Sequence, residues 1–215
     1  MTLESLISQA AAFSVAECEH REPSLFGVTD GKAVGTYLEH KFISRLADRY
    51  EFDRGNSASG IDIPSLEVDI KVTSVRQPQS SCPYKAARQK IYGLGYHLIV
   101  FVYDKSDNAR TKTSRLCILH TIFIDKVRTA DYQMTRGIRE ILDRDGNEDD
   151  LVAFLFDKNL PVDDVEARNI ARRLLEDPPQ QGYLTISNAL QWRLQYQRVI
   201  QEAGSVTGIR RASGG

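Results

Sequence analysis

The chain has few cysteines and no long hydrophobic run, and each absence excludes a class of protein. Its three cysteines, Cys18, Cys82 and Cys117, are odd in number, far apart and without a C-x-x-C pair. This pattern argues against a disulfide framework and against a structural zinc site. No apolar run approaches the length of a membrane span, and the first twenty residues contain acids but no basic segment of the kind that begins a secretory signal. We therefore expect a cytoplasmic protein that does not associate with a membrane.

The chain also lacks the net positive charge expected of a protein that approaches a polyanion, because its formal charge is -1. The distribution of charge along the chain nevertheless favours binding to a polyanion. Residues 70–103 contain no acid, and their bases are Lys71, Arg76, Lys85, Arg88 and Lys90. Such a stretch is typical of a phosphate-binding surface, since neutralising phosphates releases condensed counterions. A segment rich in acids at 140–166 is expected to be a solvated surface that faces away from the nucleic acid.

Residues 60–74, GIDIPSLEVDIKVTS, combine alternating hydrophobicity with two aspartates and a lysine. Apolar and polar residues alternate over 66–73, which predicts a strand that buries one face and presents its charges on the other. Asp69 and Lys71 would lie side by side on the charged face. A Pro-Ser turn could fold Asp62 back beside them.

These residue types suit the hydrolysis of a phosphodiester. Mg²⁺ binds one or two carboxylates while keeping several waters, and it generates hydroxide from water. Asp62 and Asp69 fit that demand, and the backbone carbonyl of Ile70 is a candidate third ligand. Lys71 could donate to the phosphate, polarise the water or act as a base, and the sequence leaves these roles open. Glu67 is a rival ligand that we expect to be a solvated neighbour; a solvated, salt-bridged strand face is the plain alternative for the whole motif.

The order Asp62, Asp69, Ile70, Lys71 resembles the PD-(D/E)xK nuclease superfamily and, within it, the type II restriction endonucleases. The resemblance covers residues 35–104, about a third of the chain, and departs from the motif at Ile61, where the family name has Pro. It implies that Asp62 and Asp69 hold Mg²⁺, for which Mn²⁺ can substitute. It also implies that Lys71 acts on the water or the phosphate.

A further acid precedes the motif on a predicted helix. Residues 35–50, GTYLEHKFISRLADRY, have apolar residues at helical spacing, and Glu39 falls on the flank of the apolar face. A carboxylate beside a buried face is costly unless it is paired or bound to a metal. Because the family commonly places an acid on a helix before the metal-binding hairpin, the resemblance assigns Glu39 to the site. An ordinary surface acid is the alternative.

The remaining periodicities indicate an α/β fold with a mixed central β-sheet flanked by helices, restriction-endonuclease-like, and a mainly helical C-terminal part. The expected helices are the first twenty residues, 84–92, 132–143, 161–175 and 185–203, and the expected buried strands are 95–104, a continuous apolar run suited to a parallel strand, and 115–124. Residues 150–156 are ambiguous, and 74–84 are expected to be a loop. The last helix would pack on the core, form a homodimer interface, or pair with 163–175 as a helix-turn-helix. The predicted organisation is one nuclease domain spanning 1–215, with a catalytic core at about 30–125, a helical portion at about 126–205 and a flexible tail at 206–215.

Side chains after the motif are candidates for DNA contact. They are Arg76, Gln77, Gln79, Lys85, Arg88 and Lys90. Arg pairs bidentately with guanine and Gln with adenine, so the loop could read base edges, although an ordinary polar loop explains it equally well.

These observations lead us to expect a magnesium-dependent, sequence-specific endonuclease of the type II restriction type that cuts double-stranded DNA. Cutting both strands of a symmetric site favours a homodimer, and a companion DNA methyltransferase could act on the same site. The alternatives are a repair or structure-selective nuclease of the same superfamily and a non-catalytic DNA-binding regulator.

Overall fold

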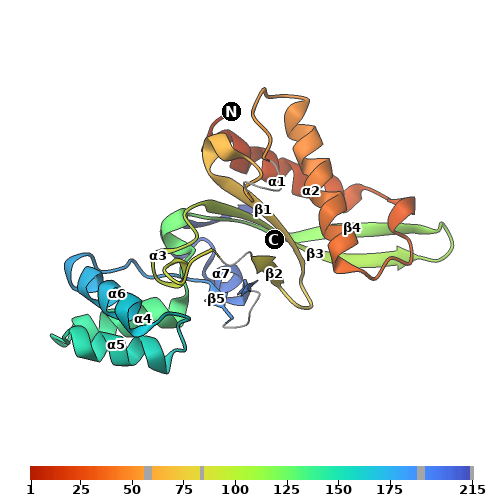
Figure 1. The fold of residues 1–215 in the computed structure, drawn as a ribbon. Helices are drawn as coiled ribbons and strands as arrows, with labels where there is room; N and C mark the ends of the chain where they lie inside the picture. The colour runs from red at the N-terminus through yellow and green to blue at the C-terminus, as the bar shows by residue number, and fades with distance from the viewer. Residues whose placement is uncertain (56–59, 83–84, 188–191, 214–215) are drawn as a thin grey trace.

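The computed structural model describes residues 1–55, 60–82, 85–187 and 192–213 (Figure 1). A four-stranded sheet lies at its centre, in the order β1 (Val68–Ser74), β3 (His97–Asn108), β4 (Thr113–Ile124) and β7 (Ile209–Ser213). β1 runs parallel to β3, whereas β4 is antiparallel to both of its neighbours. The predicted mixed sheet flanked by helices is therefore confirmed.

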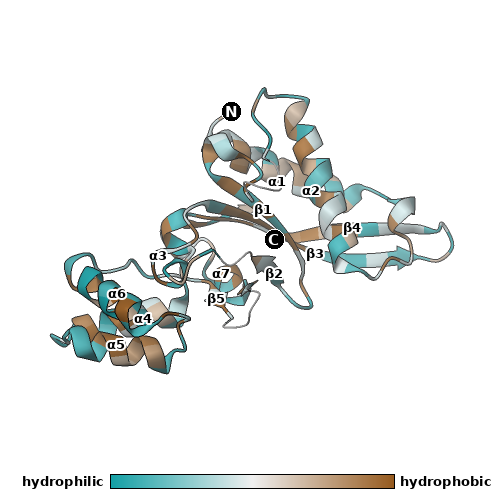
Figure 2. Ribbon diagram, viewed as in Figure 1, coloured by the Kyte–Doolittle hydropathy of each residue, from teal (hydrophilic) through white to brown (hydrophobic). Residues whose placement is uncertain are grey.

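One face of this sheet is covered by α1 (Leu3–Glu19) and α2 (Gly31–Ala47), as Figure 1 shows. Three aromatic rings form the centre of this layer: Phe13 of α1, Phe42 of α2 and Phe101 of β3, with centroids 5.1 to 5.6 Å apart. Packing of large rings at these separations holds α2, and hence Glu39, against the strands. The distal ends of β3 and β4 extend beyond the helices and become hydrophilic (Figure 2).

The other face carries a second, three-stranded sheet in the order β2 (Gln79–Cys82), β6 (Trp192–Gln195) and β5 (Thr185–Ile186), followed by α7 (Gln197–Glu202). Its apolar side packs on the central sheet through Trp192, Leu194 and Tyr196, which are 0 to 1% exposed. Burial on both faces explains the continuous apolar run of β3.

A separate helical layer consists of α4 (Tyr132–Leu142), α5 (Glu148–Asp157) and α6 (Asp164–Glu176), which gather at one end of the molecule (Figure 1). The short α3 (Gln89–Tyr92) contacts it. The acid-rich segment belongs to this layer, where Arg168 lies 3.4 Å from Glu148 and 3.2 Å from Asp149. Part of its negative charge is thus paired within the layer.

Several expected elements are wrong. The long helix at 185–203 is replaced by β5, β6 and α7, and residues 188–191 of that range lie outside the described residues. Trp192 to Tyr196 alternate strictly between apolar and polar residues, a period of two that fits a strand better than a helix. The helix-turn-helix alternative falls with the helix.

The tail, which was expected to be flexible, forms a strand over Ile209–Ser213. β7 pairs with the open edge of β4, and Ile209 is fully buried. The expected basic helix is limited to α3, and the expected loop contains β2. β2 and β7 are short strands that form by pairing with strands distant in the sequence. Their own residues therefore carry little information that would predict a strand.

The structure bears on the expected lack of membrane spans and of disulfides. Within the part of the chain that the structure describes, no helix is long and apolar enough to cross a membrane. Cys18 and Cys117 form a disulfide that joins α1 to β4, although the cysteine pattern argued against disulfides. The two cysteines are 99 residues apart in the sequence, so no local pattern predicts their pairing.

Candidate active site

Asp62 is brought to β1 by a tight reversal of the chain. Ile63 and Val68 form an antiparallel bridge around a short 3₁₀ turn, Pro64–Leu66, and Glu67 closes it in the left-handed region with a φ of 52°. The carboxylate of Asp62 then accepts a hydrogen bond from the backbone N–H of Ile70 at 2.7 Å. The predicted reversal is present, although it is a turn and a bridge, and the strand begins at Val68.

Asp69 and Lys71 follow on β1 with side chains on the same face, as the alternation predicts. Asp69 is only 4% exposed, and its carboxylate lies 2.6 Å from the ammonium of Lys71. β1 is the outermost strand of its sheet, so the N–H and carbonyl of Ile70, on the side facing Asp62, leave from a free edge. The candidate ligands therefore meet along one strand edge.

Glu39 reaches the same edge from α2. The helix passes close to β1 at Gly35, where a Cβ would lie 3.9 Å from atoms of Val72. Burial, together with the nearby carboxylate of Asp62 and opposed by Lys71, raises the pKa of Glu39 to about 7. The structure thus brings together all four residues that the sequence assigned to the site.

The electrostatics are those of a crowded anionic cluster with one cation. Burial raises the pKa of Asp69 to about 7, against the attraction of Lys71 and with the help of a hydrogen bond that the protonated carboxyl donates to Asp62. Burial also disfavours the ammonium of Lys71, but Asp69, Asp62 and Glu39 outweigh it and raise the pKa of Lys71. Desolvated carboxylates that repel one another create a demand for further positive charge.

The donor set fits a divalent cation with few protein ligands. Among the described residues, no three His, Cys, Asp or Glu side chains form a metal-binding cluster. The donors at the edge are the carboxylates of Asp62 and Asp69 and the carbonyl of Ile70, a set of hard oxygens that leaves room for water, as Mg²⁺ requires. Glu67 is directed elsewhere, because its carboxylate binds Lys126 at 2.6 Å.

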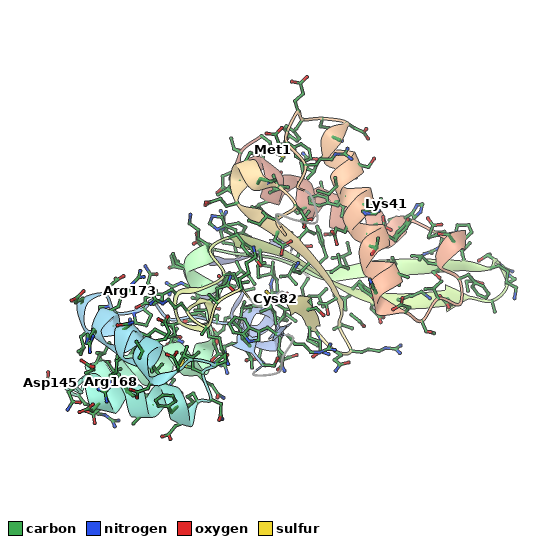
Figure 3. All side chains as sticks on the ribbon, viewed as in Figure 1. Met1, Lys41, Cys82, Asp145, Arg168 and Arg173 are labelled. Carbon is green, nitrogen blue, oxygen red and sulfur yellow. A yellow bond between two sulfur atoms is a disulfide. The ribbon has the colours of Figure 1, made fainter. Side chains whose placement is uncertain are left out.

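A groove of about 750 Å³ runs past this edge. It is lined by residues of α2, β1, β2 and β6, among them Lys32, Glu39, Lys71, Gln79, Ser81 and Arg193. The buried Cys82 follows Ser81 on β2, near the centre of the molecule in Figure 3, and burial raises the pKa of its thiol. The sequence had not singled out Arg193, since it is 122 residues from Lys71 and only the pairing of β2 with β6 brings it here.

The candidate DNA-contacting residues divide into two groups. Arg76, Gln77 and Lys85 are exposed, and Gln79 lines the groove. Arg88 instead binds Glu166 of α6 at 2.8 Å. Lys90 is 3% exposed, and burial lowers its pKa. Gln77 and Gln79 line the groove and are placed to meet a ligand there, and Arg76 and Lys85 remain exposed to solvent. The second group supports the helical layer.

Comparison with known proteins gives two matches over nearly the whole chain. Residues 1–211 match the family model described as type II restriction enzyme NspV. The type II restriction enzyme NspV of Nostoc sp. (strain ATCC 29411 / PCC 7524) is 65% identical over 209 residues, which cover 97% of this chain and 95% of the relative. No solved structure matches.

Proposed function

This chain belongs to the family of the type II restriction enzyme NspV, and from this premise we propose that it hydrolyses DNA with Mg²⁺ held at the edge of β1. Membership makes it a sequence-specific DNA endonuclease, and type II restriction enzymes generally use divalent metal ions. The observation that carries the proposal is the convergence of Asp62, Asp69 and Lys71 beside the free carbonyl edge of Ile70.

Asp62, Asp69 and the Ile70 carbonyl would hold the cation. When bound, Mg²⁺ supplies Lewis acidity to the phosphate and makes its water a stronger nucleophile. The hydrogen bond from Ile70 fixes one oxygen of Asp62 and leaves the other for the metal. This preorganisation reduces the rearrangement needed when metal and substrate arrive.

Lys71 keeps its charge through Asp69, so we assign it to the phosphate and to orienting the attacking water rather than to proton abstraction. Glu39 tunes the site from α2, because its carboxylate lies against Asp62 and adds negative charge to the cluster. The groove that contains these groups would receive the duplex beside β1 and β2.

The proposal includes a homodimer, a companion DNA methyltransferase and a cytoplasmic location. A homodimer supplies two centres for the two strands of a symmetric site. A companion DNA methyltransferase would protect that site, and cytoplasmic DNA would be the substrate. In a cytoplasm that keeps thiols reduced, Cys18 and Cys117 would be two thiols in contact.

The test is digestion of long, sequenced DNA in Mg²⁺ or Mn²⁺, followed by mapping of the fragment ends. Defined fragments from the wild type are expected, and Lys71→Ala and Asp69→Asn should abolish cleavage while retaining DNA binding. Arg136→Ala, at an exposed position on α4, is the matched control and should cut normally. Undiminished cleavage by Lys71→Ala would overturn the proposed site, and cleavage confined to flaps or mismatches would favour a repair nuclease.

A further inference from the structure

The outer face of the three-stranded sheet is polar throughout the described residues. Directly opposed residues of antiparallel strands project from the same face. Gln79, Gln195 and Thr185 form one such row across β2, β6 and β5. Ser81 and Arg193 form the next, and Ser187 extends it by accepting a hydrogen bond from the Arg193 N–H at 3.0 Å.

The orientation of this face is fixed by what lies beneath it. Four of the five alternate residues of the same strands are at most 3% exposed and pack into the core: Cys82, Ile186, Trp192 and Leu194. The fifth, Ser80, shares a hydrogen bond with the Tyr196 hydroxyl at 2.6 Å. A slip of one residue in register would exchange the two faces and bury Arg193. Burial of the apolar side chains therefore fixes which polar side chains lie on the outer face. The face thus presents the same side chains in every folded molecule.

Its composition differs from an ordinary solvated sheet surface. The two rows contain amides, hydroxyls and one guanidinium, and no acid. Ser81, Arg193 and Gln79 also line the groove that contains Lys71 and Glu39. A duplex held with a phosphate at Lys71 would therefore approach this sheet as its next neighbour.

We propose that the paired strands β2 and β6 enter the major groove of the duplex, where Arg193 selects a guanine within the recognition sequence and Gln79 and Gln195 contact neighbouring bases. This assignment rests on the proposed function, because it places the phosphodiester at the edge of β1. The major groove admits a two-stranded ribbon, and its base edges show a unique pattern of donors and acceptors. Arg193 matches the two acceptors of guanine with its two-pronged guanidinium, and the amides match adenine.

The experiment measures both cleavage and binding on the site mapped for the wild type and on all its single-base variants. Binding is measured with Ca²⁺ in place of Mg²⁺. Arg193→Ala should lose about ten- to a hundredfold in kcat/KM and affinity on the natural site. It should also lose discrimination at one guanine and keep it at the other positions. Arg193→Lys should leave discrimination at that guanine weakened, because the ammonium lacks the planar, two-pronged donor geometry of the guanidinium.

Two results would overturn the proposal. One is an Arg193→Ala variant that discriminates among sequences as the wild type does. The other is equal weakening on every sequence, with rescue by Arg193→Lys and a salt slope reduced by about one, which identifies a phosphate contact. Gln195→Ala, on the same face, repeats the test if Arg193→Ala unfolds, with loss of discrimination at one adenine expected and unchanged discrimination counting against the ribbon. Arg136→Ala controls for charge.

Failure of the proposed function would look different. A wild type that binds its site selectively but does not cut in Mg²⁺ or Mn²⁺ counts against the metal chemistry at Asp62 and Asp69. The bound sequence would then be identified by selecting duplexes that the wild type retains, and binding to that sequence and its single-base variants still decides the role of Arg193.

Discussion

The hydroxyl of Thr73 accepts a hydrogen bond from the backbone N–H of Gln79 at 2.9 Å. Thr73 is buried on β1, two residues beyond Lys71, and Gln79 is the first residue of β2. The same hydroxyl lies 3.0 Å from the carbonyl of Gln79. The strand that carries Lys71 and the proposed base-reading strand are therefore connected by a buried side chain as well as by the intervening turn.

Thr73→Val should loosen this connection. The substitution keeps the shape and removes the hydroxyl. The N–H of Gln79 then keeps only its other acceptor, the carbonyl of Gln77 at 2.8 Å, and the lost hydrogen bond costs about 0.5–1.5 kcal/mol. We expect a lower free energy of unfolding in denaturant titrations and weaker discrimination between the natural site and its single-base variants. Thr73→Ser keeps the hydroxyl and should restore discrimination. Equal discrimination by the Val variant and the wild type would show that the contact does not couple the strands.

Gly55→Ala should displace Asp62. The N–H of Gly55 donates to the Asp62 carbonyl at 2.8 Å, and a Cβ on Gly55 would lie 1.6 Å from the carbonyl oxygen of Ile61. The backbone must move, and a shift of about 1 Å at a reacting group can reduce the rate about a hundredfold. Single-turnover cleavage assays measure this loss.

The control for that variant is Gly204→Ala, remote from the groove. Gly204 has a φ of +90° and open space around its Cβ position, so the alanine strains the backbone without a clash. It should lower the melting temperature and leave cleavage unchanged. Parallel loss of activity in both variants would mean that general destabilisation, rather than movement of Asp62, reduces cleavage.

Mg²⁺ should stabilise the folded protein in the absence of DNA. A ligand that binds only the folded state adds about 2.7 kcal/mol at a hundred times its dissociation constant. Glu39→Gln removes a desolvated charge beside Asp62, so its melting temperature in chelator should exceed that of the wild type. The increment produced by Mg²⁺ should be smaller in the variant, and an equal increment in both proteins would place Glu39 outside the metal's electrostatic reach.

Glu22 should contribute to the loss of stability in acid. Its carboxylate accepts hydrogen bonds from the Ser24 hydroxyl at 2.7 Å and the Tyr37 hydroxyl at 2.8 Å. The bond from Ser24, opposed by burial and supported by Tyr37, lowers the pKa of Glu22 from 4.5 to about 2. A lowered folded-state pKa stabilises the protein above pH 4.5, and this stabilisation is lost as the pH falls from 4.5 toward 2.

Melting curves of wild type and Glu22→Gln at a series of pH values test this pH dependence of stability. The variant should melt lower at pH 7, and the gap should close between about pH 4.5 and pH 2. Glu176→Gln, at an exposed position at the end of α6, should melt like the wild type throughout. A gap for Glu22→Gln that persists unchanged below pH 2 would show that the contacts of Glu22 do not depend on its charge.

Local alternation was sufficient to predict one strand and part of the site. A period of two places Asp69 and Lys71 on one face of β1 wherever that strand lies. The continuous apolar run of β3 predicted a strand buried on both sides, which the structure confirms. The predicted helix at 185–203 was wrong because the apolar positions of this segment fit a helical spacing as well as the alternation of a strand. Pairing with β2 decides between helix and strand for β6.

The sequence by itself determined which chemical groups are present and which neighbours share a strand face, because backbone geometry sets that over a few residues. Only the tertiary structure decided that Asp62 reaches the edge of β1 and that Glu39 and Arg193 line the groove beside it, since they come from a turn, a helix and a distant strand. It also decided that β7 completes the central sheet and that Lys90 is buried. Such contacts follow from packing the apolar faces of separate elements together, and no short window of sequence contains that information.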